Sequence, residues 1–288
     1  MGWYERIVGR AVRLIFCGVR GSTPAPGAEF LRYGGHTSCV AVSKADEAPC
    51  LVLDGGTGLR RVSPWCGDEP FRGTVLLSHL HWDHTHGLPF FDAGVRPGHR
   101  VTLLLPAPDG EPLEILGRGL SPPHFPIGPE DLGEGWTFGR LAEGFFEIEG
   151  FRVLVREIPH KGGQTFGFRV EHDGSSFAYL SDHAPLLLGP GAHGEGKLHE
   201  AALELAHGVD VLVHDAQYLG REFPEVAFLG HASVEYACSL AEAATVRSLV
   251  LFHHAPSRTD EEITAMVDAL APSTFDICAA EEGMVIEL

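Results

Sequence analysis

The sequence predicts an α/β (α+β) fold in which two β-sheets lie face to face between layers of helices. Short β-type runs dominate the first two thirds of the chain, and helical patterns appear mostly in the last third, where they alternate with strands. Many strands followed by alternating strands and helices favour two sheets over one doubly wound sheet. Because strand runs continue along the whole chain, we expect a single domain over residues 1–288.

Apolar and β-branched residues define the expected strands, and turn residues bound them. In chain order these strands are Arg13–Gly18, Cys39–Ser43, Cys50–Asp54, Thr74–Ser78, Val101–Leu105, Phe151–Val155, Thr165–Glu171, Phe177–Leu180, Val209–His214, Ser248–Phe252 and Met284–Glu287. Helices are expected at Lys197–His207 and Val234–Ala244, which have apolar residues at a spacing of about 3.6. A third helix is expected at Asp260–Ala271, which opens with an acidic first turn.

Residues 106–143 differ in composition from the rest of the chain. They are rich in proline and glycine and show little strand pattern. Strands are expected on both sides of this segment, so an irregular insertion packed near a functional site fits better than a linker between domains.

Charge and hydropathy exclude several classes of protein. The chain has 21 basic and 39 acidic side chains, a net charge of −18, which argues against binding a long nucleic acid. No apolar run approaches the ~20 residues of a membrane span. The charged N-terminal segment does not resemble a signal peptide, and six dispersed cysteines without a CxxC pair suggest reduced thiols, so we expect a cytoplasmic protein.

The strongest motif is HLHWDH, directly after the apolar strand at Thr74–Ser78. Side chains two residues apart in an extended segment point the same way, so His79 and His81 can bind one metal ion. If a helix follows, Asp83 and His84 diverge by about 100° and can face a second ion. Imidazole nitrogens and a carboxylate are zinc-type ligands.

Further histidine and aspartate residues follow later strands. His160 follows the run Phe151–Ile158, and Asp182 follows the strand at Phe177–Leu180. His253 and His254 follow the strand at Ser248–Phe252. Taken together with HLHWDH, these strand ends predict a metal centre that draws ligands from several parts of the chain.

The order of these motifs resembles the metallo-β-lactamase superfamily. The resemblance runs from GVRGSTPAPG, YGGHTSCV and LDGGTGLR through HLHWDH to IPHKGG, YLSDH, VHDAQY, GHASVEYA and LFHHAPSR. It implies a four-layer αββα sandwich with two metals at its edge. The last four motifs resemble the phosphodiesterase branch, which includes tRNase Z and small cyclic-phosphate phosphodiesterases.

The resemblance also implies a ligand set. By position, the first metal is bound by His79, His81 and His160, and the second by Asp83, His84 and His253, with Asp182 bridging the two. His253 is preferred to His254 because it directly follows the strand. The redox di-iron branch commonly has a glutamate at the position of His81, so two zinc ions are expected, with manganese or iron as alternatives.

The expected reaction is hydrolysis of a small or cyclic phosphodiester through a metal-bridging hydroxide. By resemblance, His231 serves as general acid or phosphate donor and Asp215 orients it; Asp215 replaces the glutamate typical of tRNase Z. Asp83 is counted with them among the catalytic residues. The alternative for His231 is a structural place before the Val234 helix, with Ser233 as its cap. Asp54, in LDGGTG, is expected to reach the ligand histidines through its carboxylate.

Other functions remain open. A tRNA 3′-processing endonuclease of the tRNase Z type is one, although only 21 residues separate His160 from Asp182, where tRNase Z inserts its tRNA-clamping arm. A thioesterase or lactonase of the same fold is another. A metal-binding regulatory module without turnover belongs to a different class. The expected partner is a small phosphodiester substrate, without a membrane, and a homodimer is compatible with the sequence.

Overall fold

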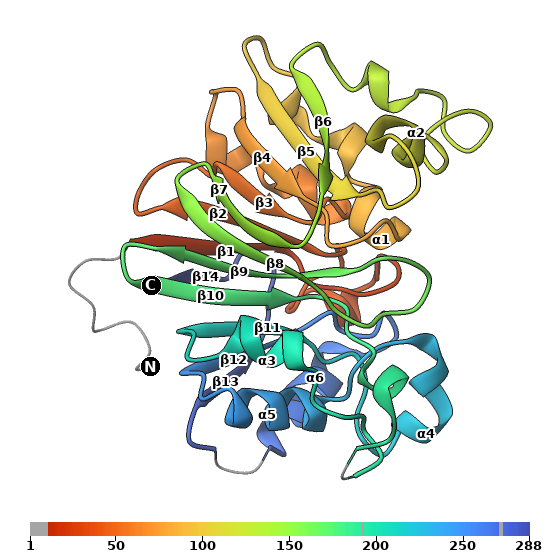
Figure 1. Ribbon diagram of the computed structural model, residues 1–288, viewed down its shortest axis with the longest axis vertical. Coiled ribbons are helices and arrows are strands. Elements are labelled where there is room, and N and C mark those ends of the chain that lie inside the picture. Colours follow the sequence, from red (N-terminus) through yellow and green to blue (C-terminus); the bar gives the residue numbers. More distant parts are fainter. Residues whose placement is uncertain (1–10, 192, 271–272) are drawn as a thin grey trace.

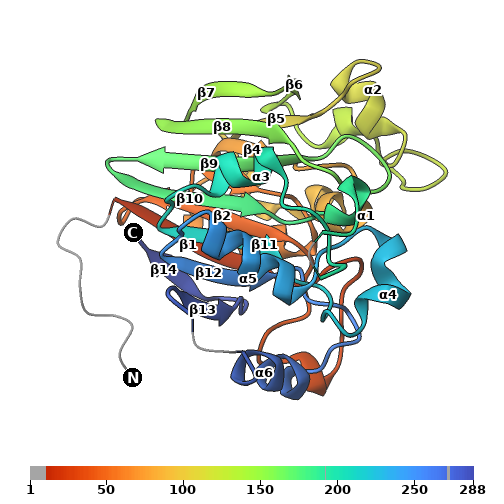
Figure 2. The same cartoon turned by 60° about the horizontal axis from the view of Figure 1, so that its bottom comes forward.

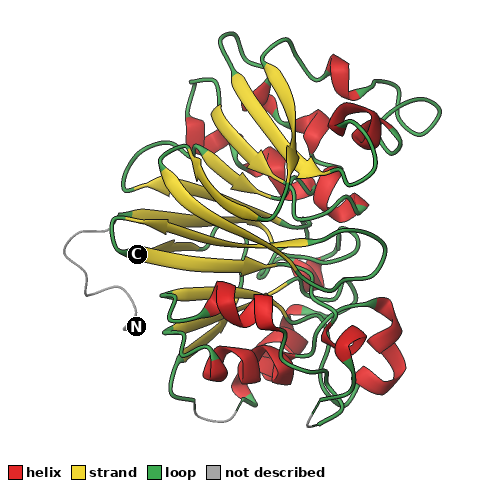
Figure 3. Cartoon of the chain, viewed as in Figure 1, coloured by secondary structure: helices red, strands yellow, loops and turns green. Residues whose placement is uncertain are grey.

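The structure, a computed structural model, describes residues 11–191, 193–270 and 273–288. Two seven-stranded sheets stack against each other, and helices cover both outer faces (Figures 1 and 3). This arrangement confirms the predicted sandwich of two sheets between helices. Residues 1–10, which include much of the segment judged not to be a signal peptide, lie outside the described residues, as does Ala271 at the end of the third expected helix.

The two sheets are built alike. The first, in spatial order, consists of β14 (Val285–Glu287), β1 (Val12–Gly18), β2 (Cys39–Lys44), β3 (Leu51–Leu53), β4 (Arg72–Leu76), β5 (Arg100–Pro106) and β6 (Trp136–Leu141). The second consists of β13 (Asp276–Ala279), β12 (Ser248–Phe252), β11 (Val211–Asp215), β10 (Ser175–Leu180), β9 (Phe166–His172), β8 (Phe151–Glu157) and β7 (Gly144–Ile148). Each has three antiparallel and three parallel pairings. The parallel strands bring several carboxyl ends to one edge of the sandwich.

Within residues 11–191, 193–270 and 273–288, the α-helices that accompany the sheets are α1 (Trp82–Thr85), α2 (Pro112–Gly117), α3 (Glu200–Ala206), α4 (Phe223–Val226), α5 (Val234–Ala243) and α6 (Asp260–Asp268). Helices α3, α5 and α6 lie along the second sheet (Figure 2) and share a buried apolar cluster with β10, β11 and β12. Among the described residues, no helix is long and apolar enough to cross a membrane.

Successive side chains along each strand point to opposite faces of its sheet, so one set fills the core between the sheets and the other packs against the outer helices. In β1, Leu14 and Phe16 point into the core between the two sheets, whereas Ile15 and Cys17 pack against the short helices outside the first sheet. Phe168 of β9 and Phe252 of β12 meet Phe16 in the central core. All these side chains are at most 1% exposed. A core of this size holds the strand ends rigidly, and the site is built on them.

Three strands, β6, β7 and β13, were not expected from the sequence. The segment 106–143, expected to be irregular, holds α2 and ends in β6, which pairs with β5 in parallel register from Val101–Trp136 to Pro106–Leu141. Its sequence WTFGRL carries a glycine and has two buried positions, so the neighbouring strand rather than intrinsic pattern imposes the extended backbone.

Candidate metal centre

The expected ligand residues gather at one edge of the sandwich. His79 and His81 follow β4, and Asp83 and His84 lie on α1. His160, Asp182 and His253 follow β8, β10 and β12, so four strand ends supply the site. Every one of these side chains except that of His81 is buried.

A glycine turn fixes helix α1 in place. The amide of Gly55 donates to the carbonyl of His84 at 2.8 Å, and the amide of Gly87 donates to the carbonyl of Gly55 at 2.8 Å. A Cβ on Gly56 would lie 2.1 Å from the carbonyl oxygen of Asp83. The LDGGTG motif therefore needs glycine because the backbone of α1 packs directly on it.

The side chains form two adjoining groups. The first is His79, His81 and His160, and the second is Asp83, His84, Asp182 and His253; in each group the candidate ligand atoms lie within 4.8 Å of one another. Asp182 touches both groups. Its Oδ1 is 3.8 Å from Nε2 of His79 and 3.6 Å from Nε2 of His160. Its Oδ1 also lies 3.3 Å from Nε2 of His253, and its Oδ2 lies 3.0 Å from Nε2 of His84.

The rings of His79 and His160 are each oriented by a partner on the side away from the cluster. Nδ1 of His79 lies 3.0 Å from Oγ of Ser78, and Nδ1 of His160 lies 2.6 Å from the carbonyl oxygen of Gly230. These contacts leave Nε2 of both rings facing the cluster. Holding the second ring nitrogen in this way is the usual arrangement around a metal-binding histidine.

The carboxylate of Asp54 supports the centre from behind, as expected. It is fully buried, and Oδ2 lies 2.8 Å from Nδ1 of His84. It also accepts hydrogen bonds from the amide and hydroxyl of Ser78, from Tyr179 and from Ser181. This network fixes the carboxylate of Asp54, whose contact with Nδ1 of His84 is an ion pair without hydrogen-bond geometry.

Several buried polar atoms of the cluster have no hydrogen-bond partner among the described residues. These include Nε2 of His79, Nε2 of His84 and Oδ2 of Asp182. Nε2 of His84 and Oδ2 of Asp182 approach to 3.0 Å but lack hydrogen-bond geometry. Buried unpaired polar atoms are costly, and lone pairs that converge on a common point fit a divalent cation.

The electrostatics also suit a cation. Burial, aided by the neighbouring His84, holds the pKa of His79 well below its usual range, and burial lowers that of His160 to about 4. These two rings are neutral at physiological pH, as metal ligands must be. Against the effect of burial, Asp182 raises the pKa of His84 and that of His253, so a cation that binds there displaces their protons. Against the opposing effect of burial, His253 and His84 hold the pKa of Asp182 well below its usual value. The carboxylate is therefore ionised.

His253, and not His254, belongs to this cluster. Nδ1 of His253 lies 3.0 Å from Oε1 of Gln217, and its Nε2 lies 3.1 Å from Oδ2 of Asp83. Its backbone has φ of 60°, a strained conformation for a side chain of this size. His254 points away, with Nε2 donating to the carbonyl of Ala280 at 3.0 Å.

His231 and Asp215 form a pair beside the cluster. Nδ1 of His231 lies 2.9 Å from Oδ2 of Asp215 and 3.6 Å from Oδ1 of Asp182. Asp215 ends β11 and is fully buried, and it also accepts from the amides of His183 and Gln217. Ser233 caps α5 by accepting from the amide of Tyr236, as the structural alternative for His231 expects. The contact of His231 with Asp215 is separate from this cap.

A cleft of about 350 Å³ opens onto these groups, and Ser22, Trp82, Asp83, His160, Leu229 and His231 are among the residues that line it.

Two residues that orient the candidate ligands were not predicted from the sequence. Gln217 orients His253, and the amide of Ser22 donates to Oδ2 of Asp83 at 2.6 Å. Ser22 belongs to the motif GVRGSTPAPG and Gln217 to the motif VHDAQY. The resemblance of these motifs to those of the family is the signal that could have pointed to both residues.

Comparison with known proteins agrees with this geometry. Residues 51–254 match the beta-lactamase superfamily domain. The chain belongs to the metallo-β-lactamase superfamily. Proteins of this superfamily typically bind divalent metals such as zinc, and the chain is a metal-dependent hydrolase.

Three similar proteins illustrate the likeness. The chain is similar to ribonuclease Z of Exiguobacterium sibiricum, with 27% identity over 66% of this chain and 73% of that protein. It also resembles the metallo-beta-lactamase fold protein YhfI from Bacillus subtilis, with 15% identity, a TM-score of 0.72 and coverage of 96% of this chain and 99% of YhfI. A diphosphatase from the PhnP family has 18% identity, a TM-score of 0.69 and coverage of 96% and 98%. The likeness to ribonuclease Z supports the predicted phosphodiesterase branch.

Proposed function

We propose that this superfamily member is a phosphodiesterase that uses two divalent metal ions, zinc by preference, to hydrolyse a small phosphodiester. The observation that carries the proposal is the pair of adjoining ligand groups that meet at Asp182, beside the His231–Asp215 pair. Ribonuclease Z, a relative by sequence, belongs to the same superfamily and supports phosphodiester chemistry.

The residues divide into two sets of ligands. His79, His81 and His160 would hold one ion, and Asp83, His84 and His253 the other. Asp182 would contribute to both, because its two oxygens face both groups. When bound, two such ions supply an activated water and positive charge next to the phosphodiester oxygens.

Protein side chains protonate the leaving group. His231 lies at the cleft and bonds Asp215 through Nδ1, which leaves Nε2 to donate a proton to the departing alkoxide. Asp215 stabilises the tautomer and orientation of the ring, and its own position is fixed by backbone amides. Asp83 keeps its place through the amide of Ser22.

The proposal is tested with the purified protein in zinc or manganese. We expect hydrolysis of bis(p-nitrophenyl) phosphate and of at least one member of a cyclic-nucleotide panel, and loss of both on chelation. No hydrolysis of any phosphodiester, with turnover of thioesters or lactones instead, would show that the fold serves another ester chemistry in this chain.

A second candidate, cleavage of precursor tRNA, is favoured by the likeness to ribonuclease Z. Two features weigh against it: the 21 residues between His160 and Asp182 hold little more than β9 and β10, and the net charge is −18. A gel assay on precursor tRNA decides between the candidates, because efficient endonucleolytic cleavage would replace the small substrate with tRNA.

A further inference from the structure

A second, larger cavity lies beside the metal cleft. Its volume is about 1080 Å³, ample for a small-molecule ligand. Its walls are formed by residues 24–36, the short helix Thr57–Arg61, residues 86–90, residues 119–125 of the insertion, and Glu282 before β14. None of the residues expected to bind metal lines it.

One turn of chain separates the cavity from the metal cleft. Asp83 lines the cleft and His86, three residues further on, lines the cavity, a rise of about 5 Å along a helix. Trp82 lines the cleft and is 70% exposed, and its ring stacks on His86 at 5.6 Å between centroids. A ligand that passes over Trp82 and His86 can therefore occupy both spaces.

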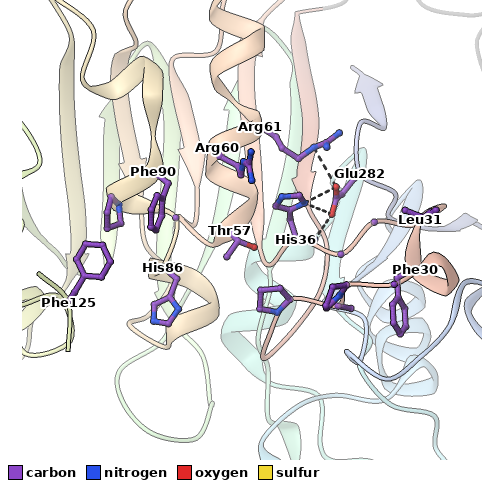
Figure 4. Close-up of a pocket in the computed structure, with 18 of the residues that line it drawn as sticks. Phe30, Leu31, His36, Thr57, Arg60, Arg61, His86, Phe90, Phe125 and Glu282 are labelled. Atoms are coloured by element: carbon purple, nitrogen blue, oxygen red, sulfur yellow. Dashed lines mark hydrogen bonds and ion pairs between the residues drawn. The ribbon is translucent and has the colours of Figure 1, made fainter. Parts of the chain in front are cut away.

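The cavity carries positive charge in an otherwise acidic protein. Arg60 lies on its wall, is exposed, and has no hydrogen-bond or ion-pair partner among the described residues. Nε of Arg61 is 3.5 Å from Oε2 of Glu282, and Nδ1 of His36 is 3.2 Å from the same carboxylate (Figure 4). Glu282 is the single carboxylate among the described lining residues, so the two arginines leave a net positive wall.

Aromatic rings form the neighbouring wall. Phe90 is 60% exposed, and its ring meets that of Phe125 edge-on at 6.0 Å. In the view of Figure 4, Arg60 lies between Phe90 on one side and His36 on the other. An exposed aromatic ring and an unpaired guanidinium that line the same cavity are a combination that binds a planar base and its phosphate together.

We propose that this cavity binds a nucleotide unit at the non-reacting end of the substrate, with its phosphate on Arg60 and Arg61 and its base on Phe90. The inference rests on the proposed phosphodiesterase function and narrows its substrate class to a phosphodiester that carries a further nucleotide with its own phosphate group. The scissile phosphate would lie in the metal cleft, across the Trp82–His86 stack from the bound nucleotide.

The test is calorimetric titration of the metal-loaded protein with adenosine 5′-monophosphate, adenosine and inorganic phosphate separately. Adenosine 5′-monophosphate should bind at least about ten-fold more tightly than either part alone, because both walls contribute. Arg60→Gln should weaken its binding about ten-fold or more, and Phe90→Ala about five-fold or more. Arg247→Ala, which removes an arginine just before β12 whose side chain is 77% exposed, is the control and should bind like the parent.

Two outcomes overturn the inference: equal affinity of the parent, Arg60→Gln and Phe90→Ala proteins, or binding no tighter than that of phosphate. The first would place the nucleotide in the metal cleft, and the second would reduce the cavity to a simple anion site. Failure of the phosphodiesterase proposal is recognised separately, because bis(p-nitrophenyl) phosphate lacks a nucleotide and tests the metal chemistry alone. Equal unfolding temperatures of all variants show that they are folded.

Discussion

Replacing His231 with glutamine separates its proposed role as proton donor from a structural role. The ring is 8% exposed and bonds Asp215 through Nδ1 at 2.9 Å. Positioned general acids contribute about 10²- to 10⁴-fold to rate, which corresponds to roughly 2.7–5.5 kcal/mol of activation free energy. Asp215 keeps three backbone amide donors in the variant, so we expect a stability loss near the low end for such a bond, about 1.5 kcal/mol.

The size of the effect should depend on the leaving group. A p-nitrophenolate departs as an anion and needs no proton, whereas an alkoxide does. For the His231→Gln variant, kcat on a substrate with an alkoxide leaving group, such as a cyclic nucleotide, should therefore fall about 10²-fold or more, while kcat on bis(p-nitrophenyl) phosphate changes by much less. Both rates are measured at equal metal content.

Two results would refute this reasoning. If both substrates slow equally at unchanged metal content, His231 acts on the phosphate and not on the leaving group. If the variant loses metal in elemental analysis, the imidazole is a ligand. Ser233→Ala is the structural control: it removes the cap of α5, costs about 1 kcal/mol in denaturant unfolding and should preserve the ratio of the two rates.

Further expectations follow from the same geometry. Asp182→Asn should lower metal content below that of the parent in elemental analysis, because its charge faces both ligand groups; unchanged loading would remove Asp182 from the ligand set. Asp54→Ala should cost about 3–5 kcal/mol in denaturant unfolding, since it leaves Ser78 and Tyr179 without their buried acceptor; a cost below about 1 kcal/mol would contradict this. Hydrogen bonds from His36 oppose the effect of burial and hold the pKa of Glu282 below its usual value, so ionised Glu282 stabilises the fold above about pH 4.5 and this contribution is lost on acidification. The stability difference between the parent and Glu282→Gln should therefore shrink from about pH 6 to about pH 3.5, and a difference independent of pH would count against it.

The strands were predictable from the sequence where their apolar pattern agrees with their buried position in the sheet. Buried strands such as β12, Ser248–Phe252, carry continuous apolar runs, and their ends mark the metal centre because parallel strands finish at one edge. Strand β6 was not predictable, since its extended backbone depends on pairing with β5 more than on its own residues. The sequence of a segment encodes its own backbone preference. It does not directly encode the neighbouring strand whose pairing can override that preference.

The candidate site also has residues that the sequence predicts and residues that depend on tertiary contacts. The place of His253 directly after its strand singled it out from His254, and the structure places it beside Asp83. Gln217 and Ser22 were not found, because their roles depend on contacts across 36 and 61 residues of chain. The second cavity likewise arises only when five separated parts of the chain meet, Glu282 among them. The residue types that can bind a metal are visible in the sequence. The orientation of those side chains and the cavity that would recognise a substrate arise from tertiary contacts.

A metal titration tests the central claim most directly. The metal-depleted protein is supplied with increasing zinc, and hydrolysis of bis(p-nitrophenyl) phosphate is measured together with bound metal. The two ligand groups that meet at Asp182 predict that activity rises to a plateau at about two ions per chain. Full activity at one ion per chain, or no phosphodiester hydrolysis at any loading, would contradict the account.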